Sequence, residues 1–277
     1  MNEQFDRKIK YALYHDHFEN SKRYNIPRAQ LIIADIPYNL GNNAYASNPS
    51  WYVDGDNSNG ESKKAGKSFF KTDENFNIRN FFDFSVRLLK PEPKEKGKAP
   101  CMIIFCAFEQ MHDIIALAKE YGFNRYQPRF FIKNYSSQVL KANMRPVGAT
   151  EFAVVLYRDK LPKFNNYGKM VFDWTTWTKD MSVPRLHPTQ KPIPGLKELI
   201  ETYTDPYDVV IDPVAGSGTT IRAAVECGRH AYGFEIERDF YNAAMTKMLN
   251  NIAVWQPMEL DFGEVKEIEQ LTLELES

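Results

Sequence analysis

Apolar runs alternate along the chain with amphipathic stretches, and this alternation predicts a sheet covered by helices. The β-rich apolar segments are Leu31–Ile36, Cys101–Phe108, Arg129–Ile132, Phe152–Tyr157, Val209–Ile211 and His230–Ile236. The segments with helical spacing are Arg79–Leu89, Gln110–Glu120, Ile193–Tyr203, Thr219–Cys227 and Arg238–Asn250. Strands that alternate with helices are typical of an α/β fold with a doubly wound sheet.

Three stretches break this rhythm. Residues 39–77 are rich in Asn, Ser, Gly and Lys, and residues 158–186 combine Trp174 and Trp177 with mixed charges. Connections this long inside a compact domain are usually functional or disordered. Residues 256–277 form an acidic tail. We expect a single domain over residues 1–277, in which the stretches 39–77 and 158–186 could reach a macromolecular substrate; the alternative for each is an ordinary surface insertion.

The formal net charge of −1 hides an uneven distribution. Between Gly122 and Thr150 there are no acidic residues and five basic ones, which are Arg125, Arg129, Lys133, Lys141 and Arg145. The tail carries seven acidic residues against Lys266 alone. Basic residues interleaved with aromatic ones favour contact with phosphates, although a solvated face accounts for the charges equally well.

The three cysteines, Cys101, Cys106 and Cys227, are odd in number and lack the spacing of zinc ligands. We therefore expect reduced thiols and no metal site. No run of about 18 apolar residues predicts a membrane span, and no secretory signal is evident. These features favour a cytoplasmic protein, in a bacterial or virus-infected cell.

A glycine-rich turn follows the apolar segment Val209–Ile211 and precedes a helical pattern. Its residues run Asp212-Pro213-Val214-Ala215-Gly216-Ser217-Gly218-Thr219-Thr220. Glycines let the backbone approach a ligand, and the helix N-terminus offers unpaired N–H groups. A phosphate-binding P-loop needs lysine where Thr219 stands, and a dinucleotide fingerprint needs glycine where Ile221 stands. Neither requirement is met, which leaves another nucleotide-like ligand or a plain turn.

Acidic residues stand at the ends of two further predicted strands. Glu235, followed by Ile236, comes about 20 residues after the glycines, where an acid can accept both hydroxyls of a ribose. Asp35-Ile36-Pro37-Tyr38 ends the segment Leu31–Ile36. Ligands of open α/β sheets bind at such carboxyl ends.

Together these motifs resemble the β group of DNA methyltransferases that methylate exocyclic amino groups. The resemblance rests on Asp-x-Pro-Tyr at Asp35–Tyr38, the later Asp-Pro…Gly-x-Gly turn, and His187-Pro188-Thr189-Gln190-Lys191-Pro192 ahead of that turn. It covers roughly Tyr11–Asn250. In this group the catalytic motif precedes the cofactor motif, so the order is circularly permuted.

The resemblance implies a Rossmann-like methyltransferase fold with a mixed, mostly parallel sheet, and S-adenosylmethionine as cofactor. The catalytic residues it implies are Asp35, Ile36, Pro37 and Tyr38. The cofactor-binding residues we expect are Asp16, Asp35, His187, Thr189, Gln190, Lys191, Asp212, Pro213, Ala215, Gly216, Ser217, Gly218, Thr219, Glu235 and Ile236. Lys191 is expected to reach the methionine carboxylate. Asp16 would end a short N-terminal strand, Tyr14–Asp16, beside the adenine of the cofactor.

The implied chemistry explains the residue types at the catalytic motif. An exocyclic amino nitrogen is a poor nucleophile because its lone pair is delocalised into the ring. The Asp35 carboxylate and the Ile36 carbonyl could hold its two hydrogens, while Tyr38 stacks on a base flipped from the duplex. The family usually has Pro where this chain has Ile36, which puts the rigidity of the loop in question.

The resemblance thus implies methylation of adenine N6 in double-stranded DNA, because cytosine-N4 members of the group more often begin this motif with Ser. It also implies a DNA-contacting loop at 39–77 and a small target-recognition insert at 158–186. Methylation of cytosine N4 is the nearest competing reaction. Methylation of RNA or of a protein amide also stays open, as does a nucleic-acid-binding protein without turnover. Members of the group are often dimeric, so a homodimer is expected. We read Glu151–Val155 as scaffold and assign no catalytic role to Lys133.

Overall fold

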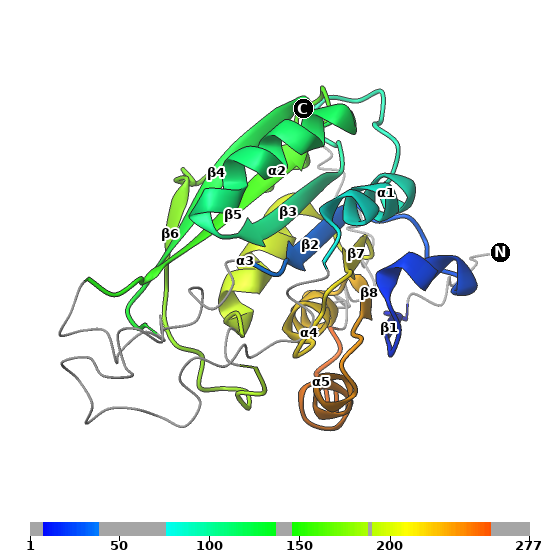
Figure 1. The fold of residues 1–277 in the computed structure, drawn as a ribbon, viewed down its shortest axis with the longest axis vertical. Coiled ribbons are helices and arrows are strands. Elements are labelled where there is room, and N and C mark those ends of the chain that lie inside the picture. The colour runs from blue at the N-terminus through cyan, green and yellow to red at the C-terminus, as the bar shows by residue number, and fades with distance from the viewer. Residues whose placement is uncertain (1–7, 39–75, 137–145, 188–189, 256–277) are drawn as a thin grey trace, which may run out of the picture.

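A single sheet organises the part of the chain that the computed structural model describes, which is residues 8–38, 76–136, 146–187 and 190–255. The strand order is β1-β8-β7-β2-β3-β5-β4-β6 (Figure 1). The strands are β1 Tyr11–Tyr14, β2 Leu31–Asp35, β3 Cys101–Cys106, β4 Arg125–Lys133, β5 Thr150–Tyr157, β6 Trp174–Trp177, β7 Val209–Asp212 and β8 His230–Phe234. The helices are α1 Ile78–Leu88, α2 Phe108–Glu120, α3 Ile193–Tyr203, α4 Thr219–Glu226 and α5 Arg238–Ala243, with a 3₁₀ turn at Phe18–Arg23 and a π-helical turn at Ala244–Met248.

The sheet is mixed and mostly parallel, as the sequence predicts. Parallel pairing joins β1 to β8, β8 to β7, β7 to β2 and β2 to β3. Strand β5 pairs antiparallel with both β3 and β4, and β6 pairs in parallel with β4. Among the described strands, β5 alone therefore runs against the others.

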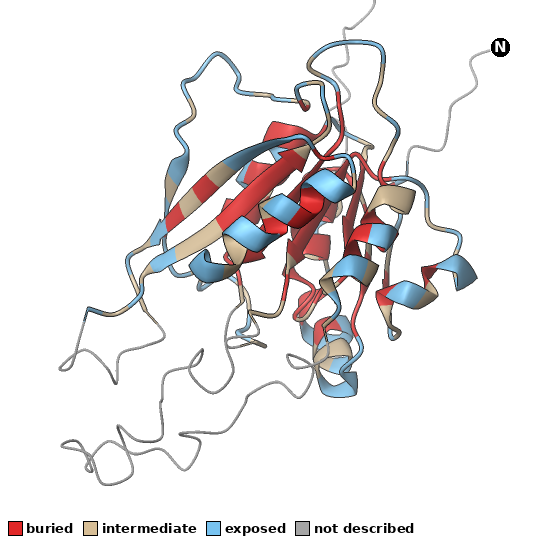
Figure 2. Ribbon diagram, turned by 45° about the horizontal axis from the view of Figure 1, so that its top comes forward, coloured by how far each residue is buried: buried red, intermediate tan, exposed pale blue. Residues whose placement is uncertain are grey.

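Helices cover both faces of the sheet, because the central strands are apolar on both sides. Leu31 and Ile33 of β2 pack into one core with residues of α3 and α4. Ile32 and Ala34 of the same strand pack into a second core with residues of α1 and α2. Figure 2 shows the strands buried between these helices, whose outer surfaces are exposed.

The expected N-terminal strand is present as β1, although it covers Tyr11–Tyr14 and ends before Asp16. It pairs in parallel with β8, so the chain's beginning lies beside the last strand of the sheet. The short N-terminal strand that the resemblance implies is therefore present, and it forms the edge of the sheet beside β8.

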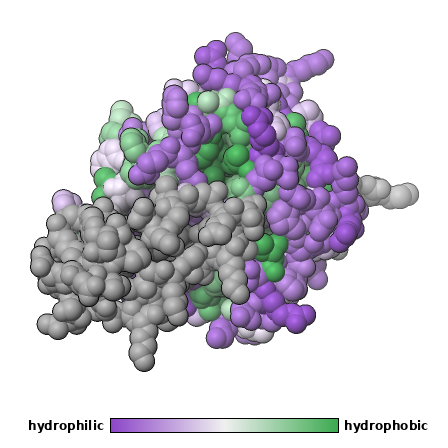
Figure 3. All heavy atoms as spheres, in the orientation of Figure 1, coloured by the Kyte–Doolittle hydropathy of each residue, from purple (hydrophilic) through white to green (hydrophobic). Residues whose placement is uncertain are grey.

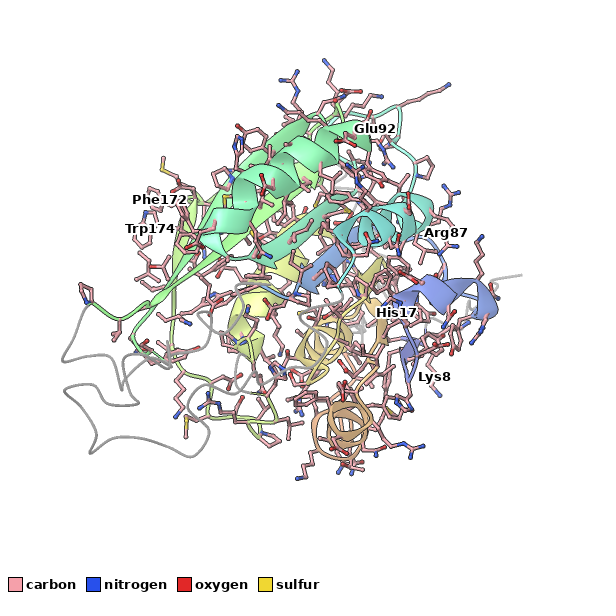
Figure 4. The ribbon with its side chains drawn as sticks, in the orientation of Figure 1. Lys8, His17, Arg87, Glu92, Phe172 and Trp174 are labelled. Atoms are coloured by element: carbon pink, nitrogen blue, oxygen red, sulfur yellow. The ribbon has the colours of Figure 1, made fainter. Side chains whose placement is uncertain are left out.

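The stretch 158–186 is partly built into the sheet. Strand β6 lies within it and forms the sheet edge beside β4. The prediction missed this strand because four residues with alternating exposure carry little pattern. Phe172 and Trp174 lie together on that outer edge (Figure 4), their rings stacked with centroids 5.7 Å apart.

Two of the five basic residues expected to face phosphates are instead held inside the protein. Arg129 is buried and donates to the carbonyl of Phe172. Lys133 is largely buried in an ion pair with Glu151. Arg125 is exposed, whereas Lys141 and Arg145 lie outside the described residues. The reading of Arg129 and Lys133 as phosphate contacts was wrong, because β4 turns both side chains into packed surroundings.

The predicted helix Arg238–Asn250 starts where expected but changes character partway, from α5 to the π-helical turn. Most of the 39–77 loop and the whole acidic tail 256–277 lie outside the described residues. Within the ranges that are described, no helix is both long and apolar enough to cross a membrane.

Candidate active site

The site lies where the sheet connections reverse direction. β2 and β7 are parallel neighbours. From β2 the chain continues to β3 on one side, and from β7 it continues to β8 on the other. The connecting segments therefore diverge above the carboxyl ends of β2 and β7, and such a switch point is where open α/β sheets bind ligands. A cavity of about 360 Å³ opens there.

Most of the residues predicted for the site line this cavity. They are Asp35, Ile36, Pro37, Tyr38, His187, Gln190, Lys191, Asp212, Pro213, Ala215, Gly216, Ser217, Thr219, Glu235 and Ile236. Gly218 and Asp16 are not among its lining residues, and Thr189 lies outside the described residues. The remaining lining residues are His17, Phe18, Phe76, Val214, Thr220, Phe234, Glu237 and Phe240.

The apolar part of this lining escaped the sequence analysis. Phe18 and Phe234 are buried, and each contacts Phe84 of α1. They read as ordinary core residues, and only the fold brings them to the cavity wall. Figure 3 shows that hydrophobic side chains reach the surface mainly in the middle of one face, between hydrophilic margins.

The glycine-rich turn adopts the backbone that its sequence predicts. Gly216 and Gly218 have φ of +51° and +76°, in the left-handed region that favours glycine. A Cβ at Gly216 would meet no atom within 4 Å, so the backbone there borders open space. Helix α4 begins at Thr219 directly after the turn. Its unpaired N–H groups give this end of the cavity a partial positive charge.

Glu235 follows β8 and closes the turn from the side. Its Oε2 accepts from the Gly216 N–H at 2.8 Å, and its Oε1 accepts from the Glu237 N–H at 2.7 Å. Burial raises the pKa of Glu235 to about 7, since these two hydrogen bonds only partly compensate for lost hydration. Glu235 therefore lies close to half ionised at neutral pH.

Asp212 ends β7 beneath the same turn. It is 4% exposed, and its Oδ1 accepts from the Val214 N–H at 3.0 Å. Burial raises the pKa of Asp212 to about 7, and the nearby Asp35 carboxylate adds to the effect. Two carboxyl groups of the cavity thus titrate near neutrality.

Asp35, at the end of β2, is held by a lysine from the segment ahead of α3. The Lys191 ammonium lies 2.7 Å from Asp35 Oδ2 and 5.1 Å from the centre of the Phe105 ring. Burial raises the pKa of Asp35, while the Lys191 charge acts against this rise. Burial alone would lower the pKa of Lys191, but Asp35 and Glu151 raise it above its usual range. The contact of Lys191 with a cofactor carboxylate stays a prediction.

Two residues that the sequence analysis did not select hold the Asp35–Tyr38 turn. Glu151 Oε2 accepts from the Tyr38 hydroxyl at 3.1 Å. Gln110 of α2 donates from Nε2 to the Pro37 carbonyl at 3.1 Å. The Ile36 N–H also donates to the Phe105 carbonyl. The turn is therefore anchored on three sides, although Ile36 replaces the usual proline.

Other predicted residues have mainly local partners. Gln190 Oε1 accepts from the Leu186 N–H, and its Nε2 donates to the Pro184 carbonyl. The His187 ring lies against Phe240 of α5, with ring centres 4.7 Å apart. Burial, followed by the charges of Lys191 and Arg185, lowers the pKa of His187 to about 4.

Asp16 accepts three hydrogen bonds from nearby residues beside the cavity. It accepts from the His17 N–H, from Asn20 Nδ2 and from the Tyr24 hydroxyl, each within 2.8 Å. Its neighbour His17 lines the cavity instead (Figure 4). Cofactor binding by Asp16 stays a prediction.

The chain is similar to known methylases in both sequence and fold. The model of the N6/N4 DNA methylase family matches residues 29–246. The putative methylase YubD of Escherichia coli K12 is 31% identical over 151 residues, covering 54% of this chain and 63% of YubD. The DNA adenine methyltransferase YhdJ of the same organism is 26% identical over 274 residues, covering 88% of this chain and 84% of YhdJ.

Two solved structures share the fold. The M1.HpyAVI–SAM complex has a TM-score of 0.60 and 22% identity, covering 85% of this chain and 98% of that one. The cytosine-N4-specific PvuII DNA methyltransferase has a TM-score of 0.61 and 14% identity, covering 87% of each chain. These likenesses show that the expected methyltransferase fold is correct.

Proposed function

The chain belongs to the N6/N4 DNA methylase family, and from that premise we propose that it methylates the exocyclic N6 of adenine in double-stranded DNA. The observation that carries the proposal is the position of Asp35 at the carboxyl end of β2, in a cavity whose other end is formed by the glycine-rich turn and Glu235. Asp35, the carboxylate proposed to bind the target amino group, and Glu235, the acid proposed to bind a ribose, therefore line the same cavity.

The cavity suits S-adenosylmethionine as the methyl donor. The buried Glu235 carboxylate matches the two ribose hydroxyls, and the open backbone at Gly216 lets a ligand approach closely. Phe18, Phe76 and Phe234 offer an apolar wall for an adenine ring. When bound, this cofactor supplies an electrophilic methyl group on sulfur.

The chain's own residues orient the amino group for the reaction. Asp35 and the Ile36 carbonyl accept the two amino hydrogens, which directs the nitrogen lone pair toward the methyl group. Tyr38 stacks on the flipped base. The bound cofactor would supply the methyl group to this nitrogen, and the proton that the amino group then gives up would pass to the Asp35 carboxylate and on to solvent. The protein contributes position and charge, and no covalent enzyme intermediate is needed.

Adenine is favoured over cytosine by two observations. The motif begins with Asp35 where cytosine-N4 members of the group more often have Ser. YhdJ, which covers most of the chain, is named a DNA adenine methyltransferase. We further propose that residues 158–186 contact the duplex beside the cavity. A homodimer stays an expectation from the resemblance.

The decisive test is to incubate the protein with S-adenosylmethionine labelled in its methyl group and with DNA, RNA or protein separately. The DNA is then digested, and its nucleosides are identified by mass spectrometry. We expect label in N6-methyldeoxyadenosine. The Asp35→Ala variant should still bind the cofactor, with a loss of affinity much smaller than its loss of rate, and transfer methyl at least ~100-fold more slowly.

Each other result has a defined meaning. Label in N4-methyldeoxycytidine would contradict the choice of adenine while keeping the reaction class. Label in RNA or protein but not in DNA would overturn the proposed substrate. Unchanged turnover in Asp35→Ala would refute the role of the Asp35 carboxylate.

A further inference from the structure

Glu151 is a buried acid that the proposed chemistry has not used. It is the second residue of β5, and its side chain is 15% exposed. Its Oε1 lies 2.5 Å from the Lys133 ammonium, and its Oε2 lies 3.3 Å from the Lys191 ammonium. The same Oε2 accepts from the Tyr38 hydroxyl. One carboxylate therefore connects three side chains around Asp35.

The reversed direction of β5 brings Glu151 to this place. Because β5 runs antiparallel to β3, its first residues lie beside the last residues of β3, with Phe152 opposite Cys106. Asp35 is paired with Phe105 on the other side of β3. Both acids therefore stand at the same edge of the sheet, and their side chains meet at Lys191.

The charges in this group alternate. Lys191 lies between the carboxylates of Asp35 and Glu151, and Glu151 lies between Lys191 and Lys133. Burial alone would raise the pKa of Glu151, but Lys191 and Lys133 lower it to about 2, so Glu151 is ionised. Buried charges that lose a partner become costly, so removal of one acid would disturb both lysines.

Two carboxylates of the described residues accept from the Tyr38 hydroxyl. It lies 3.3 Å from Asp35 Oδ1 and 3.1 Å from Glu151 Oε2. Asp35 Oδ2 is bonded to Lys191. A target amino group that binds Asp35 Oδ1 competes with the Tyr38 hydroxyl for this oxygen, and Glu151 Oε2 offers the hydroxyl another acceptor.

We propose that Glu151 is a positioning residue, whose carboxylate holds the Tyr38 hydroxyl and the Lys191 ammonium so that Asp35 Oδ1 is free for the target amino group. This proposal rests on the proposed methyl transfer. Glu151 itself does not touch the substrate. It keeps the stacking ring in place and shares the lysine that fixes the orientation of the Asp35 carboxyl.

The test is the Glu151→Gln variant, which keeps an acceptor oxygen but removes the charge. Its matched control is Glu109→Gln, the same change at an exposed position in the first turn of α2. We expect Glu151→Gln to lower kcat roughly 10- to 100-fold, through misplacement of reacting groups. The Kd for S-adenosylmethionine should change less than kcat, because Glu151 does not line the cavity and can act on the cofactor only through Lys191.

The pH profile separates positioning from a general loss of structure. The Glu151 charge raises the pKa of Asp35, so its removal should move the acid limb of the kcat profile to lower pH. Glu109→Gln should leave kcat, Kd and the profile unchanged. A Glu151→Gln variant with wild-type kcat and an unshifted profile would overturn the proposal.

Two further measurements cover the remaining outcomes. Tyr38→Phe retains the stacking ring and the buried charges but loses the contact with Glu151. It should lower kcat, and wild-type kcat would overturn the holding role even if Glu151→Gln fails to fold. If wild-type protein methylates nothing, the proposed function fails, and carbon-13 NMR of the Asp35 carboxyl decides this proposal alone. Its pKa should fall in Glu151→Gln, and an unchanged value would overturn the link.

Discussion

At the scale of single residues, the site contains several carboxyl groups, and their different surroundings give them different pKa values. Glu151 is paired with two lysines and is ionised, whereas burial leaves Glu235 and Asp212 with pKa values of about 7. Environments that push the pKa values of acids apart assign them different tasks. Here Glu151 contacts three neighbouring side chains, whereas Glu235 is the acid that we propose binds the hydroxyl groups of a ligand.

Glu235 should make cofactor binding depend on pH. In the proposed complex the ionised Glu235 carboxylate accepts from both ribose hydroxyls, and the protonated form would lose part of that capacity. Because the pKa of Glu235 is about 7, the affinity for S-adenosylmethionine should rise as the pH rises through 7. If the ionised form alone binds, Kd at pH 6 should be roughly tenfold weaker than at pH 8.

Titration calorimetry at pH 6, 7 and 8 would measure this dependence. Glu235→Gln should bind more weakly and show a smaller change with pH. The control is Asp239→Asn, an exposed acid in the first turn of α5 that does not line the cavity, which should keep the wild-type slope. The same slope in wild type and Glu235→Gln would assign the titration to another group.

At the scale of elements, the site residues that directly follow a strand could be predicted from the sequence. The site residues that reach the site from another helix or strand, through tertiary packing, could not. Helix α3 has the predicted bounds, and the glycine-rich turn and Glu235 stand at the ends of β7 and β8 as expected. Residues Gln110 and Glu151 carry no local motif. They reach the Asp35–Tyr38 turn because α2 and β5 pack beside it, and pairings so distant in sequence leave no periodic signal.

The first turn of α2 should control how firmly the catalytic turn is held. Gln110 Oε1 accepts from the Ala107 N–H at the start of the helix, while its Nε2 donates to the Pro37 carbonyl. Gln110→Glu retains the acceptor for Ala107 but loses the donor for Pro37. We expect the midpoint of thermal unfolding to change little and kcat to fall about 3- to 10-fold, since one neutral hydrogen bond contributes about 1 kcal/mol.

Gln110→Ala is the comparison, because it removes both bonds and should also lower the stability of the protein. Equal kcat values for wild type and Gln110→Glu would show that the Ile36 and Tyr38 contacts hold the turn without Gln110. Activity assays combined with thermal unfolding of the two variants distinguish these cases.

At the scale of the whole molecule, the apolar pattern predicted the central strands of the sheet but not its edge strands. The parallel strands β8, β7, β2 and β3 follow from apolar segments that alternate with helices, whereas β1 was expected only from the family resemblance. Strand β6 extends the other half from within a stretch that looks like an insertion. Because β6 pairs with β4, Arg129 of β4 can donate to the Phe172 carbonyl inside the protein. A basic residue in the sequence is therefore not always a basic residue on the surface.

The carboxyl groups of the cavity should also make global stability depend on pH. Asp212 has a folded pKa of about 7, well above the ordinary value of 3.8 in the unfolded chain. Between these two values the folded state binds more protons than the unfolded state, so the free energy of unfolding falls as the pH rises through 7. From pH 6 to pH 8 the loss due to Asp212 should be on the order of 1 kcal/mol.

The Asp212→Asn variant cannot ionise at this position but still accepts from the Val214 N–H. It keeps the other titrating groups, including His187, whose contribution has the opposite sign. Without the Asp212 charge the pKa of Glu235 falls, so the loss due to Glu235 is also smaller in the variant. Denaturant unfolding of both proteins at pH 6 and pH 8 should therefore give a larger loss for wild type by at least the contribution of Asp212. An equal loss in the two proteins would mean that Asp212 is already ionised in the folded protein at pH 6, with its charge compensated inside the cavity.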